Sequence, residues 1–143
     1  MSEEGSGADL VVAVVAGHGR FADGMVSAVQ QITGRGAAFA TVSNSGLSPT
    51  ELEDALRRHL DATGARVIFT DLPAGSCTMA ARRLLRARPD VVLVTGANVA
   101  VLMEFLFAAV SPLDTPVAGL ADVAALARAA AEKARDTLVV SGG

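Results

Sequence analysis

The chain has 143 residues, of which 51% are apolar, and a formal net charge of −3 at pH 7. This length fits one domain with a substantial core, and the dispersed basic residues give no footprint for binding nucleic acid. No apolar run approaches the roughly 20 residues that a membrane-spanning helix needs, the start lacks the pattern of a secretory signal, and a single cysteine indicates a reducing, cytoplasmic compartment without a disulfide framework.

Apolar runs alternate with amphipathic segments, which is typical of an α/β domain with a parallel sheet. We expect a disordered lead-in at residues 1–8 and a single domain at residues 9–140. The expected strands are residues 9–16, 37–42, 67–70 and 91–95, with 137–140 as a short final strand. The expected helices are residues 21–32, 49–62, 77–87, 99–110 and 121–135. This order predicts a doubly wound, mainly parallel sheet of four strands flanked by helices on both faces.

Local signals support several of these boundaries. Ser48 followed by proline and then by Glu51 predicts a capping box at the start of a helix. Gly34 and Gly64 are suited to end the helices that precede them.

Three strand ends carry candidate functional side chains. The first apolar run stops at Gly17-His18-Gly19, Asp71 follows the third strand, and Asn98 follows the fourth. Parallel strands bring their carboxyl ends to one edge of the sheet, where ligands bind in such folds. A carboxylate can hold one imidazole nitrogen as N–H and leave the other as a nucleophile. We therefore expect His18 to act as a nucleophile that Asp71 orients.

The loop after Asp71 enters a helix at Gly75, Ser76 and Cys77. Backbone N–H groups at a helix start bind anionic oxygen, and a hydroxyl beside them adds a donor. With His18 these groups are compatible with phosphoryl transfer through phosphohistidine. One cysteine and two histidines argue against a structural zinc site, and we expect no metal and no cofactor.

Simpler interpretations of the same residues stay open. His18 could be a structural histidine, Asp71 a turn residue and Ser76 a plain helix cap. Asn98 also suits a turn into a helix. At a helix start the pKa of the Cys77 thiol could fall, although a small packing residue is the simpler interpretation.

A resemblance adds specificity. The segments GHGRFADGM (17–25), FTDLPAGS (69–76) and TGANVAVLME (95–104) resemble, in this order, three segments of the mannose-family EIIA domain of the bacterial phosphoenolpyruvate:sugar phosphotransferase system. The similarity extends over about residues 10–135. It implies that His18 is phosphorylated, that Asp71 is its partner, and that the loop at Gly75 and Ser76 contacts phosphate.

The resemblance also covers other residues of these segments. Gly17, Gly19, Arg20 and Asn98 are candidate supporting residues, and Arg20 could attract either phosphate or a negatively charged partner. The family loop is commonly Gly-Gly-Ser-Pro, whereas this chain has alanine at 74 and Cys77 in place of the proline. Cysteine restores a backbone N–H at that position, so Cys77 belongs to the expected phosphate loop. This version looks most like the N-acetylgalactosamine-type branch.

The resemblance implies a phosphoryl carrier that accepts phosphate on His18 from phospho-HPr. The carrier would pass it to a separate EIIB protein for uptake of a hexose or amino sugar, and would meet the membrane only through the permease. Members of the family form dimers, and residues 137–140 could be a strand exchanged in a homodimer.

Three alternatives differ in function. The first is the EIIA-like subunit of a dihydroxyacetone kinase, which looks more like Ser-His-Ser at this site. The second is a regulatory EIIA-like module that reports phosphorylation state to a partner. The third is a phosphoglycerate-mutase-like phosphatase, which needs a second catalytic histidine, whereas His59 lies in a charged helical segment.

Overall fold

The computed structural model describes residues 10–110 and 122–143, in which strands and helices alternate. The strands are β2 (Ala13–Gly17), β3 (Phe39–Ser43), β4 (Val67–Thr70) and β5 (Val92–Val94). The helices are α1 (Phe21–Thr33), the short 3-10 helix η2 (Gly36–Ala38), α2 (Pro49–Thr63), α3 (Ser76–Ala87), α4 (Val99–Ala109) and α5 (Val123–Arg135).

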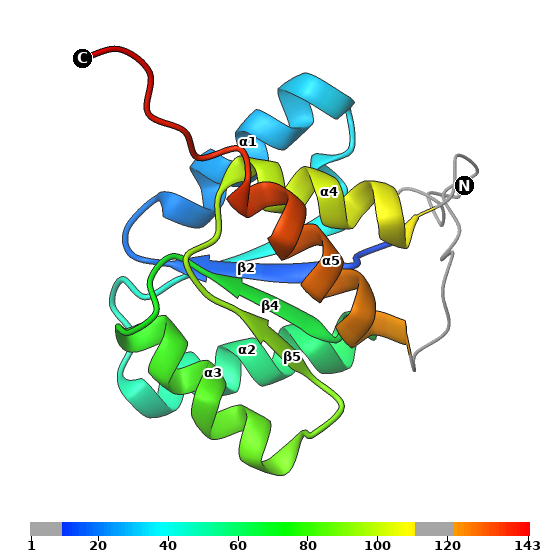
Figure 1. The fold of residues 1–143 in the computed structure, drawn as a ribbon. Helices are drawn as coiled ribbons and strands as arrows, with labels where there is room; N and C mark the ends of the chain where they lie inside the picture. Colours follow the sequence, from blue (N-terminus) through cyan, green and yellow to red (C-terminus); the bar gives the residue numbers. More distant parts are fainter. Residues whose placement is uncertain (1–9, 111–121) are drawn as a thin grey trace.

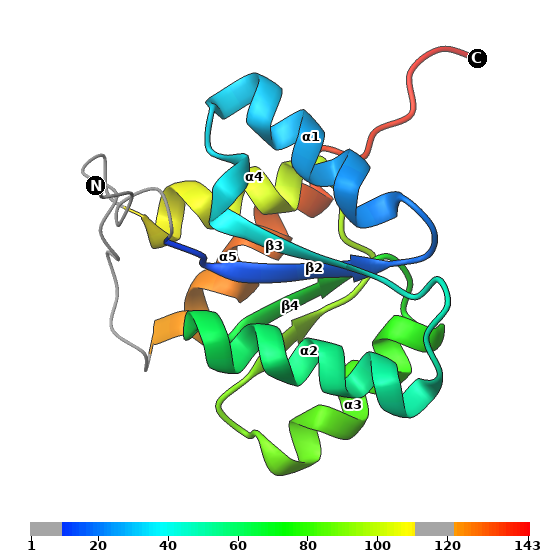
Figure 2. The ribbon, with the colours of Figure 1, turned by 180° about the vertical axis from the view of Figure 1, so that it is seen from behind.

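The four strands form one sheet in the order β3-β2-β4-β5, and all neighbouring pairs are parallel. After β2 the chain crosses to β3 on one side, whereas after β4 it crosses to β5 on the opposite side (Figure 2). The strand order therefore reverses between β2 and β4, and ligands in open α/β sheets bind beside such a reversal, at the carboxyl ends of the strands.

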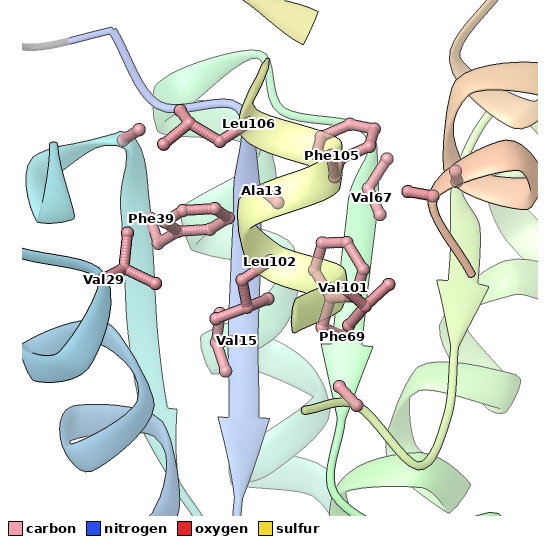
Figure 3. Packing of buried hydrophobic residues seen from close by; sticks show 14 of the residues in the cluster. Ala13, Val15, Val29, Phe39, Val67, Phe69, Val101, Leu102, Phe105 and Leu106 are labelled. Carbon is pink, nitrogen blue, oxygen red and sulfur yellow. The ribbon is translucent and has the colours of Figure 1, made fainter. Parts of the chain in front are cut away.

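Helices cover both faces of the sheet, as the sequence predicted. Helices α1, α4 and α5 lie on one face and α2 and α3 on the other (Figures 1 and 2). Each face has its own cluster of buried apolar side chains. On the first face the rings of Phe69 and Phe105 meet edge to face, with centroids 5.6 Å apart (Figure 3). Strands β2 and β4 are buried along their whole length, which explains their continuous apolar sequences.

The helix boundaries follow the expected signals closely. Ser48 and Glu51 form the predicted capping box at the start of α2. Gly34 and Gly64 adopt the left-handed conformation that ends α1 and α2. Strand β3 begins two residues later than predicted because residues 36–38 form η2 instead.

Residues 137–140 form no strand within the described parts of the chain. Helix α5 ends in a turn in which the Thr137 hydroxyl donates to the carbonyl of Ala134 at 2.6 Å, and the chain then extends away from the sheet (Figure 1). Leu138, Val139 and Val140 are consequently 75–97% exposed. A strand needs a neighbour to satisfy its backbone, so the exchange of this segment with a second copy stays a prediction.

The lead-in at residues 1–8 and the expected starts at residues 9 and 121 lie outside the described residues. None of the described helices combines the length and the apolar character needed to cross a bilayer.

Candidate active site

His18 and Asp71 meet where the strand order reverses. Each is the first residue after its strand, and the neighbouring strands β2 and β4 are in register at Ala16 and Thr70. One carboxylate oxygen, Asp71 Oδ2, accepts from the backbone N–H of His18 at 2.9 Å and lies 2.7 Å from Nδ1 of its ring. An ionised carboxylate can only accept, so Nδ1 carries the hydrogen and Nε2 presents its lone pair. The His18 side chain is 46% exposed, whereas that of Asp71 is 12% exposed.

The carboxylate of Asp71 is held in its charged form. Burial acts to raise the pKa of Asp71, but the hydrogen bonds from the backbone and the ring of His18 together outweigh it. The pKa of Asp71 is therefore lowered below its ordinary value. A permanent negative charge beside Nδ1 stabilises positive charge that develops on the imidazole ring.

Two glycines allow the ring to sit where it does. A Cβ on Gly17 would collide with the ring of Phe21 and would lie 3.0 Å from Oδ2 of Asp71. Gly75 has a φ of +132°, which side chains rarely adopt, and a Cβ there would lie 3.0 Å from His18 Cε1 and 3.7 Å from Nε2. The His18 ring therefore packs against the backbone that begins α3.

Helix α3 presents unpaired N–H groups beside this ring. It begins at Ser76, and its cap residue Gly75 has no side chain that could accept from the first turn. The backbone N–H groups of Ser76, Cys77 and Thr78 precede the first acceptor inside the helix. They carry the partial positive charge of the helix start, which favours an anion.

A buried pair of threonines, which the sequence did not single out, anchors the loop after Asp71. Thr78 donates to the carbonyl of Leu72 at 2.6 Å, and its hydroxyl oxygen lies 2.7 Å from that of Thr70. Because Thr78 has only one hydrogen to donate, Thr70 donates to Thr78. Both side chains are fully buried, so these bonds fix the path of the loop.

A second group that sequence reasoning missed comes from the end of β3. Asn44 Oδ1 accepts from the N–H of Gly19 at 3.2 Å, and Nδ2 of the same amide lies 3.2 Å from Oγ of Ser76. The hydroxyl of Ser43 donates to the carbonyl of Gly19 at 2.8 Å. The available signal was position, since residues 43 and 44 end the second strand at the same edge of the sheet as His18.

The structure separates the remaining candidates. Cys77 is fully buried and packs in the cluster under α2 and α3. Burial raises the pKa of its thiol to about 11, the negative charge of Asp71 adds to this shift, and a hydrogen bond with Ser76 opposes it. The possibility of a lowered pKa for Cys77 is therefore wrong, and what Cys77 adds to the start of α3 is its backbone N–H.

Asn98 acts as a helix cap, because its Oδ1 accepts from the N–H of Val101 at 2.8 Å. Arg20 precedes α1, is exposed, and forms no ion pair with a described residue. Gly19 has a φ of +54°, which lets the chain turn from the strand into α1. Within residues 10–110 and 122–143, no cluster of three or more His, Cys, Asp or Glu side chains offers a metal site.

A comparison with family models identifies one family. A family model described as PTS system fructose IIA component (EIIA-man) matches residues 12–117, which include His18, Asp71 and Ser76. No curated protein shows a significant match to the chain.

Several solved structures are similar over nearly the whole chain. The phosphotransferase system component EIIA from Streptococcus agalactiae has a TM-score of 0.73 at 20% identity, covering 91% of this chain and 96% of its own. The PTS IIA protein associated with the fucose utilization operon from Streptococcus pneumoniae has a TM-score of 0.67 at 23% identity, covering 90% and 91%. The mannose/sorbose specific IIA subunit from Enterococcus faecalis has a TM-score of 0.65 at 23% identity, covering 92% and 97%. These similarities show a shared fold.

Proposed function

The chain belongs to the mannose-family EIIA domains and is a component of a sugar phosphotransferase system, and we propose that it carries the phosphoryl group on Nε2 of His18. The observation that carries this proposal is the 2.7 Å contact between Nδ1 of His18 and Oδ2 of Asp71. It commits one ring nitrogen to the carboxylate and leaves the other exposed beside the start of α3.

The transfer step follows from that geometry. The lone pair of Nε2 attacks the phosphorus of the donor, the Nε2–phosphorus bond forms, and the bond from phosphorus to the donor breaks with its electron pair leaving on the donor. The hydrogen on Nδ1 stays in place. The ring gains positive charge, which the Asp71 carboxylate offsets. Transfer to the acceptor reverses these bond changes and restores the neutral ring.

The start of α3 supports the phosphoryl oxygens. Their negative charge is stabilised by the N–H groups of Ser76 and Cys77 and by the positive end of the helix. The hydroxyl of Ser76 adds a donor from an exposed position. Phosphoryl transfer depends mainly on such positioning and electrostatic stabilisation.

The donor in this proposal is phospho-HPr and the acceptor is an EIIB protein that serves uptake of a hexose or amino sugar. Both partners must reach the same nitrogen, so the same face of the molecule serves both. The exposure of the His18 side chain permits this. Leu72 and Met79 are 50% and 48% exposed, and Leu72 lies beside Gly75, so they offer apolar contact to a docked protein.

The test is phosphorylation of the purified chain by phosphoenolpyruvate, Enzyme I and HPr. We expect an acid-labile phosphate on the wild-type protein, mapped to Nε2 of His18 by NMR, and its transfer to an added EIIB protein. His18→Ala should take up no label, whereas His59→Gln, which changes the only other histidine, should be labelled normally. Labelling of the His18→Ala variant at the wild-type level would refute the assignment.

A further inference from the structure

Asn44 lies between the two loops of the proposed site. Ser43 ends β3 in register with Gly17, so Asn44 follows beside His18. The backbone N–H of Asn44 donates to the carbonyl of Gly17 at 3.1 Å. Its side-chain amide then spans the gap from Gly19 after β2 to Ser76 at the start of α3.

The direction of these bonds follows from which groups can donate. A backbone N–H only donates, so the amide atom that faces Gly19 must be the oxygen. The atom that faces Ser76 is consequently the NH₂ group, which only donates. Oγ of Ser76 therefore accepts from Asn44, and its own hydrogen is directed elsewhere.

We propose that Asn44 is a positioning residue for phosphoryl transfer, which holds the hydroxyl of Ser76 as a hydrogen-bond donor toward the phosphoryl group on His18. This inference rests on the proposed function. With one lone pair of Oγ occupied by the Asn44 amide, the hydroxyl hydrogen is available to a phosphoryl oxygen. The bond to Gly19 fixes the same amide to the loop that carries His18, so donor and nucleophile are held together.

The Cys77 sulfur is the competing acceptor for this hydrogen. Because burial raises the pKa of Cys77 to about 11, the sulfur stays a neutral thiol near pH 7. A thiol is a weak acceptor, whereas a phosphoryl oxygen carries negative charge and accepts strongly. The hydroxyl therefore turns to the phosphoryl group when one is present.

The decisive variant is Asn44→Asp, which keeps the size of the side chain and its acceptor for Gly19. Its second carboxylate oxygen would accept from Ser76, which takes away the hydrogen needed by phosphate, and would add negative charge. We expect kcat for transfer from phospho-HPr to fall about 100- to 1,000-fold, which is the scale of losing one preorganised donor, with little change in KM for the donor. The ³¹P resonance of the phosphorylated chain should shift.

Gln30→Glu is the matched control. It makes the same change from amide to carboxylate. The oxygen of the Gln30 amide also accepts a backbone N–H, that of Gly36 at 2.8 Å. Gln30 lies nine residues into α1 from its first residue, about 14 Å along the helix. It should transfer phosphate at the wild-type rate.

A double-mutant cycle distinguishes positioning through Ser76 from a general structural role. Asn44→Ala should slow transfer in the wild-type background and should have little effect in a Ser76→Ala background, because the hydroxyl that it orients is then absent. The inference is wrong if the fold-decreases in transfer rate of Asn44→Ala and Ser76→Ala multiply in the double variant. It is also wrong if Asn44→Asp transfers phosphate at the wild-type rate. Should Asn44→Asp melt far below the wild type, the cycle alone decides.

The two proposals fail in different ways. Labelling of His18→Ala would overturn the proposed function and this inference together. If His18→Ala takes up no label, as expected, but the Asn44 variants transfer phosphate at the wild-type rate, only the role of Asn44 is overturned.

Discussion

At the scale of single residues, the two nitrogens of the His18 ring meet different surroundings. Nδ1 faces a carboxylate that is largely buried, whereas Nε2 lies beside Gly75 at the start of α3, on a side chain that is 46% exposed. Both hydrogen bonds from His18 fall on the same oxygen of Asp71. The carboxylate can therefore have two separable roles, to hold the ring and to supply negative charge.

Asp71→Asn separates these two roles. The amide oxygen can take the place of Oδ2 and accept both bonds, so the ring keeps its orientation, but the negative charge is lost. Hydrogen bonds to charged groups exceed neutral ones by about 1–2 kcal/mol, so we expect transfer to slow about 5- to 30-fold. Asp71→Ala should slow it further, because it also leaves two donors unpaired. Rapid-quench measurement of both variants checks this, and equal losses would contradict it.

The ionisation of Asp71 should also make the stability of the protein depend on pH, and Asp71→Asn serves as the comparison. The pKa of Asp71 is lowered in the folded protein, so its ionisation stabilises the fold above the unfolded value of about 3.9. This contribution is lost as the pH falls through the lower, folded value. The difference in free energy of unfolding between wild type and Asp71→Asn should be constant above about pH 5 and should shrink on acidification below about pH 4. Urea unfolding at several pH values measures it, and a difference that grows on acidification would contradict it.

At the scale of elements, the turn into α3 requires a glycine, whereas the body of α1 contains a glycine that the structure does not require. Gly75 has a φ of +132° and supports the His18 ring, whereas Gly24 lies inside α1 with open space around the position of a Cβ. One substitution therefore has opposite consequences at the two sites.

We expect Gly75→Ala to lower the free energy of unfolding by about 1–3 kcal/mol, the scale of strain in a backbone region used by glycine. It should also slow phosphorylation, since the new Cβ displaces the ring. Gly24→Ala should raise the free energy of unfolding by about 0.5–1 kcal/mol and leave phosphorylation unchanged. Urea unfolding and labelling of both variants test the pair, and a stable, active Gly75→Ala protein would contradict it.

Helix ends that are determined by residues close in the sequence could be predicted well. The capping box at Ser48 and the left-handed ends at Gly34 and Gly64 are local signals, and α2 has the expected bounds within one residue. The start of β3 was less predictable, because residues 36–38 form a 3-10 turn that gives no distinct signal.

The candidate site was predictable only in part. His18, Asp71 and Ser76 directly follow strands or begin a helix, so the alternation of elements was enough to bring them to one edge. The only signal for Asn44 was its position after the second strand, because its contacts depend on the register of β3 against β2. The pKa of Cys77 was equally hidden, since it depends on burial rather than on position at a helix start.

At the scale of the whole molecule, the end of α5 and Leu138 lie beside the turn that follows β5. A cavity of about 510 Å³ is lined by residues of the turn after β5, by α5 and by Leu138. The exposed residues 138–140 follow directly. These features are compatible with a segment that pairs with a second copy of the chain.

We therefore expect the full chain to be a dimer in solution and a variant ending at Asp136 to be a monomer. The physical reason is the burial of three exposed aliphatic side chains in a partner, at about 25 cal/mol per Å² of apolar surface. A variant that lacks only residues 141–143 keeps these side chains and should remain a dimer. Light scattering at micromolar concentration gives the masses, and a monomeric full chain would exclude the exchange.

The order of the strands also divides the chain into two parts with different roles, one that forms the site and one that follows it in the sequence. All side chains that we place around the phosphoryl group lie between residues 17 and 78, whereas β5, α4 and α5 contribute apolar surface to the core. Loss of a side chain at the site, such as that of His18, should silence a protein that still folds. A defect in the second part should leave the chemistry intact and shorten the life of the molecule in the cell.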